Sequence, residues 1–245
     1  MPRFFAEPEN ISENNIIIRG SDVNHIKNVL RMQTGDTLEL CDGRGTDYSC
    51  VIETIDREEI TLGITSSQRS STELPKRIYL FQGLPKSDKM ELIIQKAVEL
   101  GVYEIIPTVT KRCIVKIDAK KEDKKTARWQ GISEAAAKQS GRGIIPTVKS
   151  PMSFKDALEY AATLDTAIIP YEKAEGMEKT RAVLSSLSDK KTVAVFIGPE
   201  GGFDEGEISD AMDKRIIPVT LGRRILRTET AGLTILSVLM MNFEE

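Results

Sequence analysis

The chain has 245 residues, of which 40% are hydrophobic and 29% are charged, and its formal net charge is -3. This length allows one or two domains with apolar cores of their own. The near balance of charges excludes a protein that binds nucleic acid through bulk positive charge alone, so any RNA binding must use a local basic surface.

Cysteine and histidine are too few and too scattered for a metal site or a disulfide framework. Cys41, Cys50 and Cys113 form no CxxC pair, and His25 is the single histidine. Structural zinc sites use closely spaced sets of such ligands. We therefore expect no metal and a reduced, intracellular chain. The N-terminus lacks the order of a signal peptide and the apolar runs are too short to span a membrane, so we expect a soluble, cytoplasmic protein.

The first part of the chain has the pattern of a small β-barrel. Between residues 14 and 64 it carries the extended runs NNIIIR, DTLELC, TDYSCVIETI and EEITLGI, with turn signals and one short helical stretch, SDVNHIKNVLR, between them. Residues 65–76, TSSQRSSTELPK, are rich in Ser, Thr and charge, and the pattern changes after them. We predict a first domain over residues 1–70 and a second over 74–245.

In the second part, apolar strand candidates alternate with amphipathic helices. The strand candidates are RIYLFQ, YEIIPTV, TAIIP, TVAVFIG and IIPVTLG. This alternation predicts an α/β fold with a mostly parallel sheet and helices on both of its faces. Asp88 and Glu91 have the spacing of a capping box at a helix start, and Gly101 is placed to end that helix. Asp204 and Glu207 repeat the capping-box spacing.

A glycine-rich turn, GPEGG at residues 198–202, directly follows the strand candidate TVAVFI. In an open α/β sheet, ligands bind beyond the carboxyl ends of strands, and glycines there let the backbone come close to a ligand. The turn is not a P-loop, because no Gly-Lys-Ser/Thr follows, and it is not the GxGxxG of a dinucleotide fold. Taken alone, it is equally well explained as a tight strand-to-helix turn.

A second segment, LGRRILRTETAG at residues 221–232, lies between a strand candidate and the last helix. It places three arginines around Ile225 and Leu226. Such a loop suits an uncharged part of a ligand while it presents cations to an anionic group. The alternative, a solvated surface turn, rarely holds two large apolar residues.

GPEGGF and LGRRILRTETA closely resemble the C-terminal motifs of the SPOUT superfamily, and specifically those of the bacterial 16S rRNA (uracil N3) methyltransferases called RsmE. Further matches follow in order along the chain: RFF at 3–5, HIKNVLR at 25–31, GD at 35–36, KSDKME at 86–91, KAVELG at 96–101 and RWQGISEAAAKQSGR at 128–142. One such motif has little specificity, but the ordered set spans nearly the whole chain and is highly specific.

The resemblance implies a SPOUT-type domain with a deep C-terminal trefoil knot, a PUA-like β-barrel that docks RNA, and a homodimer. Nothing in the periodicity predicts the knot. It also implies methylation of N3 of a specific uridine in 16S rRNA, with the assembled small ribosomal subunit as the partner. The implied cofactor is S-adenosylmethionine, with contacts from Ile169, Pro170, Gly198, Glu200, Gly202, Leu221, Gly222, Ile225 and Leu226.

Arg227 and Glu229 are the candidate catalytic residues. The pKa of the uracil N3 proton lies above neutrality, so the reaction needs that proton removed or the anion stabilised. Arg227 could steady the developing oxyanion or a phosphate. Glu229 could accept the proton, although a carboxylate at a helix N-terminus is the favoured alternative.

Candidate RNA contacts are basic residues at positions that match the family: Arg3, His25, Arg31, Lys86, Arg112 and Arg142. Each has an ordinary exposed polar role as its alternative. Lys89 and Gln139 also match the family and are placed around the RNA or across the dimer face. Trp129 could stack on a base, but a lone Trp on an amphipathic helix is more often a core or dimer contact.

Three other interpretations remain. A different SPOUT enzyme would act on tRNA or on a ribose oxygen, and the N-terminal matches count against it. A non-catalytic RNA-binding or ribosome-assembly factor would have kept the fold, and a cofactor titration separates it from an enzyme. A nucleotide-binding oxidoreductase would carry fingerprint glycines and an acidic residue about 20 positions on, which this chain lacks.

Overall fold

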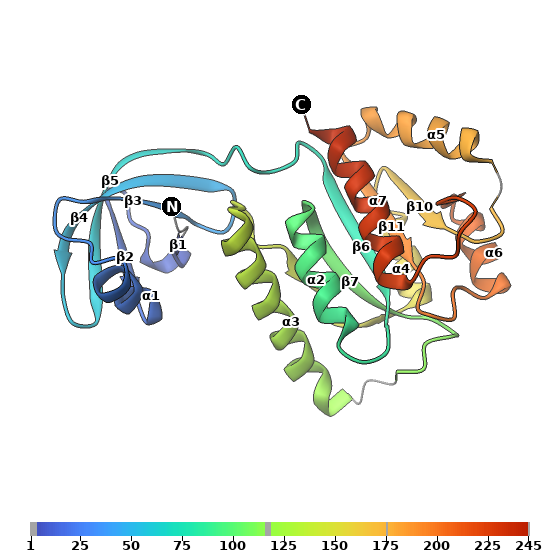
Figure 1. The fold of residues 1–245 in the computed structure, drawn as a ribbon, viewed down its shortest axis with the longest axis horizontal. Coiled ribbons are helices and arrows are strands. Elements are labelled where there is room, and N and C mark those ends of the chain that lie inside the picture. Colours follow the sequence, from blue (N-terminus) through green and yellow to red (C-terminus); the bar gives the residue numbers. More distant parts are fainter. Residues whose placement is uncertain (1–3, 116–118, 175, 245) are drawn as a thin grey trace. The chain divides into compact units, whose positions relative to one another are not determined.

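The computed structural model describes residues 4–115, 119–174 and 176–244 (Figure 1). The chain divides into two compact units: Met1–Glu73 with Ala137–Ile145, and Leu74–Ala136 with Pro146–Glu245. Residues 137–145 fall within the predicted second domain, whereas the structure groups them with the first unit.

The first unit is a curled, PUA-like β half-barrel. Its sheet has the strand order β1-β3-β4-β5-β2, from β1 (Phe4–Phe5), β2 (Asn15–Arg19), β3 (Thr37–Cys41), β4 (Thr46–Ile55) and β5 (Glu59–Arg69). Alternate side chains of these strands point inward and form one apolar core, which includes Ile16, Leu40, Ile52, Ile60 and Leu62. The helical stretch between β2 and β3 is confirmed as α1 (Ser21–Asn24) followed by a π-helical turn, η2 (His25–Val29), and a short η1 (Pro8–Asn10) precedes β2.

One strand of this unit is longer than predicted. The pattern placed a strand end at residue 64 and a linker from 65, but β5 continues to Arg69. The extension forms because Ser66, Ser67, Gln68 and Arg69 pair with the start of β4. Ser and Thr fit an exposed strand as well as a linker, so their composition alone misplaced this boundary.

Residues 137–145 are tied into the first unit by polar contacts. The Cys41 thiol donates to the carbonyl of Gly143 at 2.9 Å. The amides of Gly143 and Ile144 donate to Glu73 at 2.8 and 3.0 Å, and Glu73 also pairs with the guanidinium of Arg142. The segment therefore completes the first unit, although it is far from the rest of that unit in sequence.

The second unit is an α/β domain with an entirely parallel sheet among its described strands. The strand order is β12-β10-β11-β6-β7-β8, with β9 also paired to β7. The strands are β6 (Arg77–Gly83), β7 (Val102–Val109), β8 (Thr147–Val148), β9 (Met152–Ser153), β10 (Thr166–Pro170), β11 (Thr192–Ile197) and β12 (Ile217–Val219). The helices are α2 (Lys89–Glu99), α3 (Ala119–Ser140), α4 (Phe154–Ala161), α5 (Met177–Ser185), η3 (Ser186–Asp189), α6 (Glu205–Asp213) and α7 (Thr228–Phe243).

Helices cover both faces of this sheet, as the alternation of elements predicts. Phe81 of β6 stacks on Phe196 of β11 with ring centroids 4.5 Å apart, in a core that includes residues of α4 and α6. The next residue of β6, Gln82, points to the opposite face, where it contacts Thr228 of α7. On that face α2 and α7 pack side by side (Figure 1).

Of the two predicted capping boxes, one is confirmed and one is wrong. At the start of α6, the Asp204 amide donates to Glu207 at 2.9 Å and the Asp204 carboxylate accepts from the Gly206 amide. At the start of α2, Asp88 makes no side-chain cap. Its expected partner Glu91 instead forms an ion pair with Arg128 of α3 at 2.8 Å. A tertiary contact has therefore replaced the local one.

Within the described residues, no helix is long and apolar enough to cross a membrane. The same residues include no group of three or more His, Cys, Asp or Glu side chains placed to hold a metal ion. Cys41, Cys50 and Cys113 all lie in the described part of the chain and form no disulfide bond.

Candidate functional site

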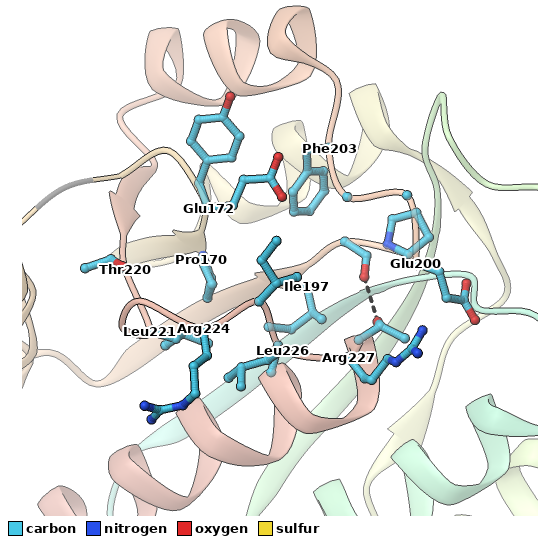
Figure 2. Close-up of a pocket in the computed structure, with 18 of the residues that line it drawn as sticks. Pro170, Glu172, Ile197, Glu200, Phe203, Thr220, Leu221, Arg224, Leu226 and Arg227 are labelled. Atoms are coloured by element: carbon cyan, nitrogen blue, oxygen red, sulfur yellow. Dashed lines mark hydrogen bonds between the residues drawn. The ribbon is translucent and has the colours of Figure 1, made fainter.

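A cavity of about 480 Å³ lies at the carboxyl ends of three neighbouring strands (Figure 2). These strands are β10, β11 and β12, and β10 lies between the other two in the sheet. The loops that follow them are therefore adjacent, and they line the cavity with residues 170–172, 197–203 and 220–228, together with Ala231 of α7. Its volume is in the range of small-molecule sites, and its position is the usual ligand position in open α/β sheets.

The glycine-rich turn packs against the end of strand β6 at Gly83, where the absence of a side chain allows the close approach. A Cβ atom on Gly83 would lie 2.7 Å from the backbone nitrogen of Pro199, which is too close for any side chain. Within the turn, Gly202 has a φ of +66°, a conformation that favours glycine. Gly83 was not predicted as part of the site, although its position at the carboxyl end of an apolar strand was the available signal.

A buried polar contact joins the two segments that line most of the cavity. The Thr228 hydroxyl, at the start of α7, donates to the Gly198 carbonyl at 2.6 Å, which is the dashed line in Figure 2. The same hydroxyl accepts from the amide of Gln82 at 2.9 Å, and Gln82 is completely buried. The shape of the cavity thus depends on a side chain of the central sheet. Sequence reasoning identified neither Gln82 nor Thr228.

Glu200 has its carboxylate on the outer side of the glycine-rich turn (Figure 2). The carboxylate accepts from the backbone amide of Lys86 at 3.1 Å and lies 3.3 Å from Nζ of Lys89, which is also 3.2 Å from Glu229. Partial burial acts to raise the pKa of Glu200, but hydrogen bonds from its own amide, from Lys86 and from Lys89 outweigh it, and the pKa lies below its ordinary value. The pairing of Lys89 with Glu229 first, and then with Glu200, raises the pKa of this lysine.

The loop after β7 also contacts the outer side of this turn. Arg112 donates to the carbonyl of Gly201 at 3.0 Å, and Lys111 lies 3.1 Å from Asp204. The Lys111 ammonium, followed by the Gly206 amide, holds the pKa of Asp204 below its ordinary value. The carboxylates of Glu200 and Asp204 are therefore engaged by backbone amides and lysine side chains. The backbone of the glycine-rich turn remains available to contact a ligand in the cavity.

The structure brings most of the expected cofactor contacts together in this cavity: Pro170, Gly198, Glu200, Gly202, Leu221, Gly222, Ile225 and Leu226 all line it. Ile169 does not; its side chain is fully buried in the core of the sheet. Tyr171, Glu172, Phe203 and Thr220 line the cavity but were not singled out from the sequence. Tyr171 and Glu172 come after the strand candidate TAIIP, Phe203 ends the motif GPEGGF, and Thr220 lies within the strand candidate IIPVTLG, and these positions were the signals for them.

The two candidate catalytic residues differ in their surroundings. Arg227 lines the cavity and is exposed. Glu229 does not line it, and its carboxylate pairs with Lys89. The geometry places Arg227 at the cavity and favours the helix-start interpretation of Glu229.

The expected RNA contacts are spread over both units. In the second unit, Lys86 and Arg112 are exposed and flank the glycine-rich turn. In the first unit, Arg31 is exposed, and His25 meets Phe4 edge to face with ring centroids 5.5 Å apart. Arg3 lies outside the described residues.

The side chains of Arg142 and Trp129 are buried rather than open to RNA. The side chain of Arg142 is only 5% exposed and pairs with Glu73, so this geometry favours a structural role over the expected RNA contact. Trp129 is buried, which agrees with the core alternative for this residue and leaves its ring covered rather than open to a base.

Two parts of the chain match families of known proteins. Residues 72–240 match the model of the RNA methyltransferase domain, and residues 18–65 match that of the RNA methyltransferase PUA domain. The fold and the site therefore define an RNA methyltransferase with a PUA domain. The Bacillus subtilis protein named Ribosomal RNA small subunit methyltransferase E is 36% identical over 250 residues, which cover 100% of this chain and 98% of that protein. This chain belongs to the ribosomal RNA small subunit methyltransferase E family.

Solved structures with the same fold include cofactor complexes. A ribosomal RNA small subunit methyltransferase E from Neisseria gonorrhoeae bound to S-adenosyl methionine is 32% identical, with a TM-score of 0.83 over 99% of this chain and 98% of that one. A putative methyltransferase from Legionella pneumophila with bound SAM is also 32% identical, with a TM-score of 0.82 over 98% of this chain and 97% of that one.

Proposed function

We propose that this protein transfers a methyl group from S-adenosylmethionine to N3 of a specific uridine in 16S rRNA, in the cytoplasm and on the assembled small subunit. The observation that carries the proposal is that GPEGG and LGRRILR line the same cavity, at the ends of three adjacent strands. Two structures about one-third identical to this chain, with similar folds, contain this cofactor, and the relatives carry the name of a small-subunit rRNA methyltransferase.

The residues around the cavity fit S-adenosylmethionine. Ile197, Phe203 and Leu226 provide apolar surface for the adenine ring, and backbone groups of the glycine-rich turn can pair with its polar edge. Glu172 provides a carboxylate for the hydroxyl or cationic groups of the cofactor. When bound, the cofactor supplies an electrophilic methyl group on a sulfonium, and the protein supplies binding, orientation and electrostatics.

Arg227 is the residue of this chain that we place at the reacting base. Loss of the N3 proton puts negative charge on the flanking carbonyl oxygens of the uracil, and a guanidinium beside them stabilises that charge. The N3 nitrogen then forms its bond to the methyl carbon as the carbon–sulfur bond breaks, and the proton goes to solvent or to a base on the RNA side. Glu229 is paired with Lys89, so we give it no role as proton acceptor.

RNA binding is assigned to basic residues on each of the two units rather than to bulk charge. Lys86 and Arg112 beside the cavity, with Arg31 and His25 of the PUA-like unit, are the residues that we propose for it. N3 is on the Watson–Crick edge of uracil, so the target base must be unpaired or turned out of its stack. This requirement favours a structured RNA within the subunit.

From the family resemblance we also propose a homodimer and the SPOUT-type knot. Exposed apolar side chains on the outer surfaces of α2 and α7, Leu92, Val238 and Met241, support a protein contact there. Light scattering coupled to size-exclusion chromatography checks the dimer: a mass of about one chain would contradict it.

The decisive experiment uses labelled S-adenosylmethionine and small subunits purified from cells that lack this protein. Label in 16S rRNA, with 3-methyluridine identified by mass spectrometry, is the expected result. Label in tRNA or on a ribose would leave the methyltransferase class but overturn the substrate. Cofactor binding without any transfer would favour the assembly-factor alternative. Free 16S rRNA tested in parallel distinguishes naked RNA from the assembled subunit.

Arg227 is tested in the same assay. Arg227→Ala should lower kcat while the affinity for the cofactor changes little, because the guanidinium acts on the uracil. Arg227→Ala protein with full turnover would remove the residue from the catalytic assignment.

A further inference from the structure

Two acidic side chains lie behind the two segments that line the cavity. Glu200 belongs to the glycine-rich turn, and Glu229 belongs to the first turn of α7, directly after Arg227 and Thr228. Oε1 of Glu200 lies 3.3 Å from Nζ of Lys89, and Oε2 of Glu229 lies 3.2 Å from the same nitrogen. One ammonium group therefore bridges the two segments.

We propose that Lys89 is a positioning residue for the cofactor: it sets the separation of the two cavity segments without lining the cavity itself. The identity of the ligand in this inference rests on the function proposed above. Both carboxylates are within reach of one nitrogen, so they are close enough to repel each other strongly when the ammonium is absent. Loss of the bridge should thus move the segments apart and weaken cofactor binding.

The bridging lysine belongs to a helix that is packed against the core. Lys89 is the first residue of α2, and the side chains that follow it on this helix, Met90, Ile93 and Ile94, are buried. The amide of Lys86, just before α2, also donates to Glu200, so both Lys86 and Lys89 bind the carboxylate of the glycine-rich turn. The backbone of Lys89 is therefore already fixed by the packing of α2. Forming the ion pairs costs less conformational entropy than it would for a lysine on a mobile surface loop.

The bridge is also partly shielded from water. The side chains of Lys89, Glu200 and Glu229 are 31%, 20% and 22% exposed. Ion pairs in this range interact more strongly than fully exposed pairs, whose contribution is small. The Thr228–Gly198 hydrogen bond joins the same two segments on the cavity side, so they are held at two separate places.

A lysine near an RNA site could instead bind a phosphate. Here two carboxylates already engage the Lys89 ammonium, and a phosphate would have to displace at least one of them. The geometry therefore favours positioning, and RNA binding is the outcome that would contradict it.

The test measures the dissociation constant of S-adenosylmethionine by calorimetry on the full-length protein. Lys89→Met should weaken binding by about tenfold or more. Lys89→Met/Glu229→Gln should recover much of the loss because one of the two repelling charges is gone. Lys89→Arg should stay within a few fold of the wild type. A simple packing defect would not be rescued by the second substitution.

Lys96→Met is the matched control. Lys96 lies on the same helix and forms an ion pair with Glu99 at 2.8 Å, but neither residue lines the cavity. This variant should bind the cofactor as the wild type does, and circular dichroism checks that all variants are folded.

Three results would overturn the inference. They are unchanged cofactor binding by Lys89→Met, absence of rescue in the double variant, and an increased KM for ribosomal subunits at unchanged cofactor affinity. Because the readout is binding, a wild-type protein that binds the cofactor but methylates another RNA contradicts only the proposed substrate. A wild-type protein that does not bind the cofactor overturns both proposals.

Discussion

The hydroxyl of Thr228 donates a 2.6 Å hydrogen bond to the carbonyl of Gly198, across 30 residues of sequence. Both groups are at the edge of the cavity, and the completely buried Gln82 continues the contact into the sheet. A buried polar group that loses its partner costs more than the bond itself contributes. The start of α7, the glycine-rich turn and strand β6 should therefore respond together to a change at Thr228.

We expect Thr228→Val to destabilise the protein and to weaken cofactor binding. Valine keeps the shape of threonine but leaves the Gly198 carbonyl without this donor, at a cost of about 1–3 kcal/mol in the free energy of unfolding. Urea denaturation and calorimetric titration measure the two effects. Thr234→Val is the control, because the Thr234 hydroxyl donates only to Thr230 within α7. Equal effects of the two substitutions would contradict the assignment.

Gly83→Ala should specifically damage the cavity. The new methyl group would meet Pro199 at 2.7 Å and would push the glycine-rich turn off strand β6. Overpacking of this kind costs about 1–3 kcal/mol, so cofactor affinity should fall by roughly tenfold. Gly131→Ala in α3 is the control: a Cβ there meets nothing within 4 Å, and alanine favours the helix. Gly83→Ala protein with normal cofactor affinity would show that the turn does not depend on this close approach.

Arg142→Met should lower stability rather than RNA affinity. Its guanidinium is nearly buried and pairs with Glu73, whose carboxylate would be left without this partner. Loss of one member of a buried pair costs about 3–5 kcal/mol. Arg19→Met is the comparison, since the Arg19–Glu59 pair is exposed and should contribute at most about 1 kcal/mol. Native stability combined with a raised KM for ribosomal subunits would restore Arg142 to the RNA-binding set.

The Asp204 cap should make the free energy of unfolding fall as the pH is lowered into the acid range. Lys111 and the Gly206 amide lower the pKa of Asp204 in the folded protein, so the carboxylate stays ionised to lower pH than in the unfolded chain. Its contribution is therefore present above the ordinary Asp pKa of about 3.9 and disappears as the pH falls through the lowered value. The stability difference between wild type and Asp204→Asn should be constant near neutral pH and shrink below about pH 4.

Urea titrations over a series of pH values measure this dependence. Asp210→Asn, on the same helix, controls for the change in net charge. A difference between wild type and Asp204→Asn that is independent of pH would show that the carboxylate charge is not what stabilises the start of α6.

Local signals explain why much of the fold was predictable. The apolar runs of the second unit each became a parallel strand, because burial on both faces leaves a continuous apolar pattern. The capping box at Asp204 and Glu207 depends on residues three positions apart, which the sequence displays directly. The two segments that line most of the cavity each come directly after a strand. Because these strands are parallel, they end at the same edge of the sheet, and this brings the two segments together.

Contacts between distant residues explain what was missed. Glu91 has the spacing of a capping residue, but Arg128, 37 positions away, is its partner in the folded protein. The Lys89 bridge reaches Glu200 and Glu229, which are more than a hundred residues away, and none of the three has a local pattern that indicates it. Such pairs depend on how the helices pack on the sheet.

The first unit is built from two stretches of chain, and this has a consequence for its synthesis. Residues 137–145 supply the Gly143 carbonyl that Cys41 contacts and the amides that satisfy Glu73. A ribosome making this protein therefore produces β6, α2 and β7 before the segment that completes the N-terminal unit exists. Until then the carboxylate of Glu73 lacks these partners, and the unit should be only marginally stable. The PUA-like unit, although first in sequence, therefore cannot reach its final form until part of the second unit has been synthesised.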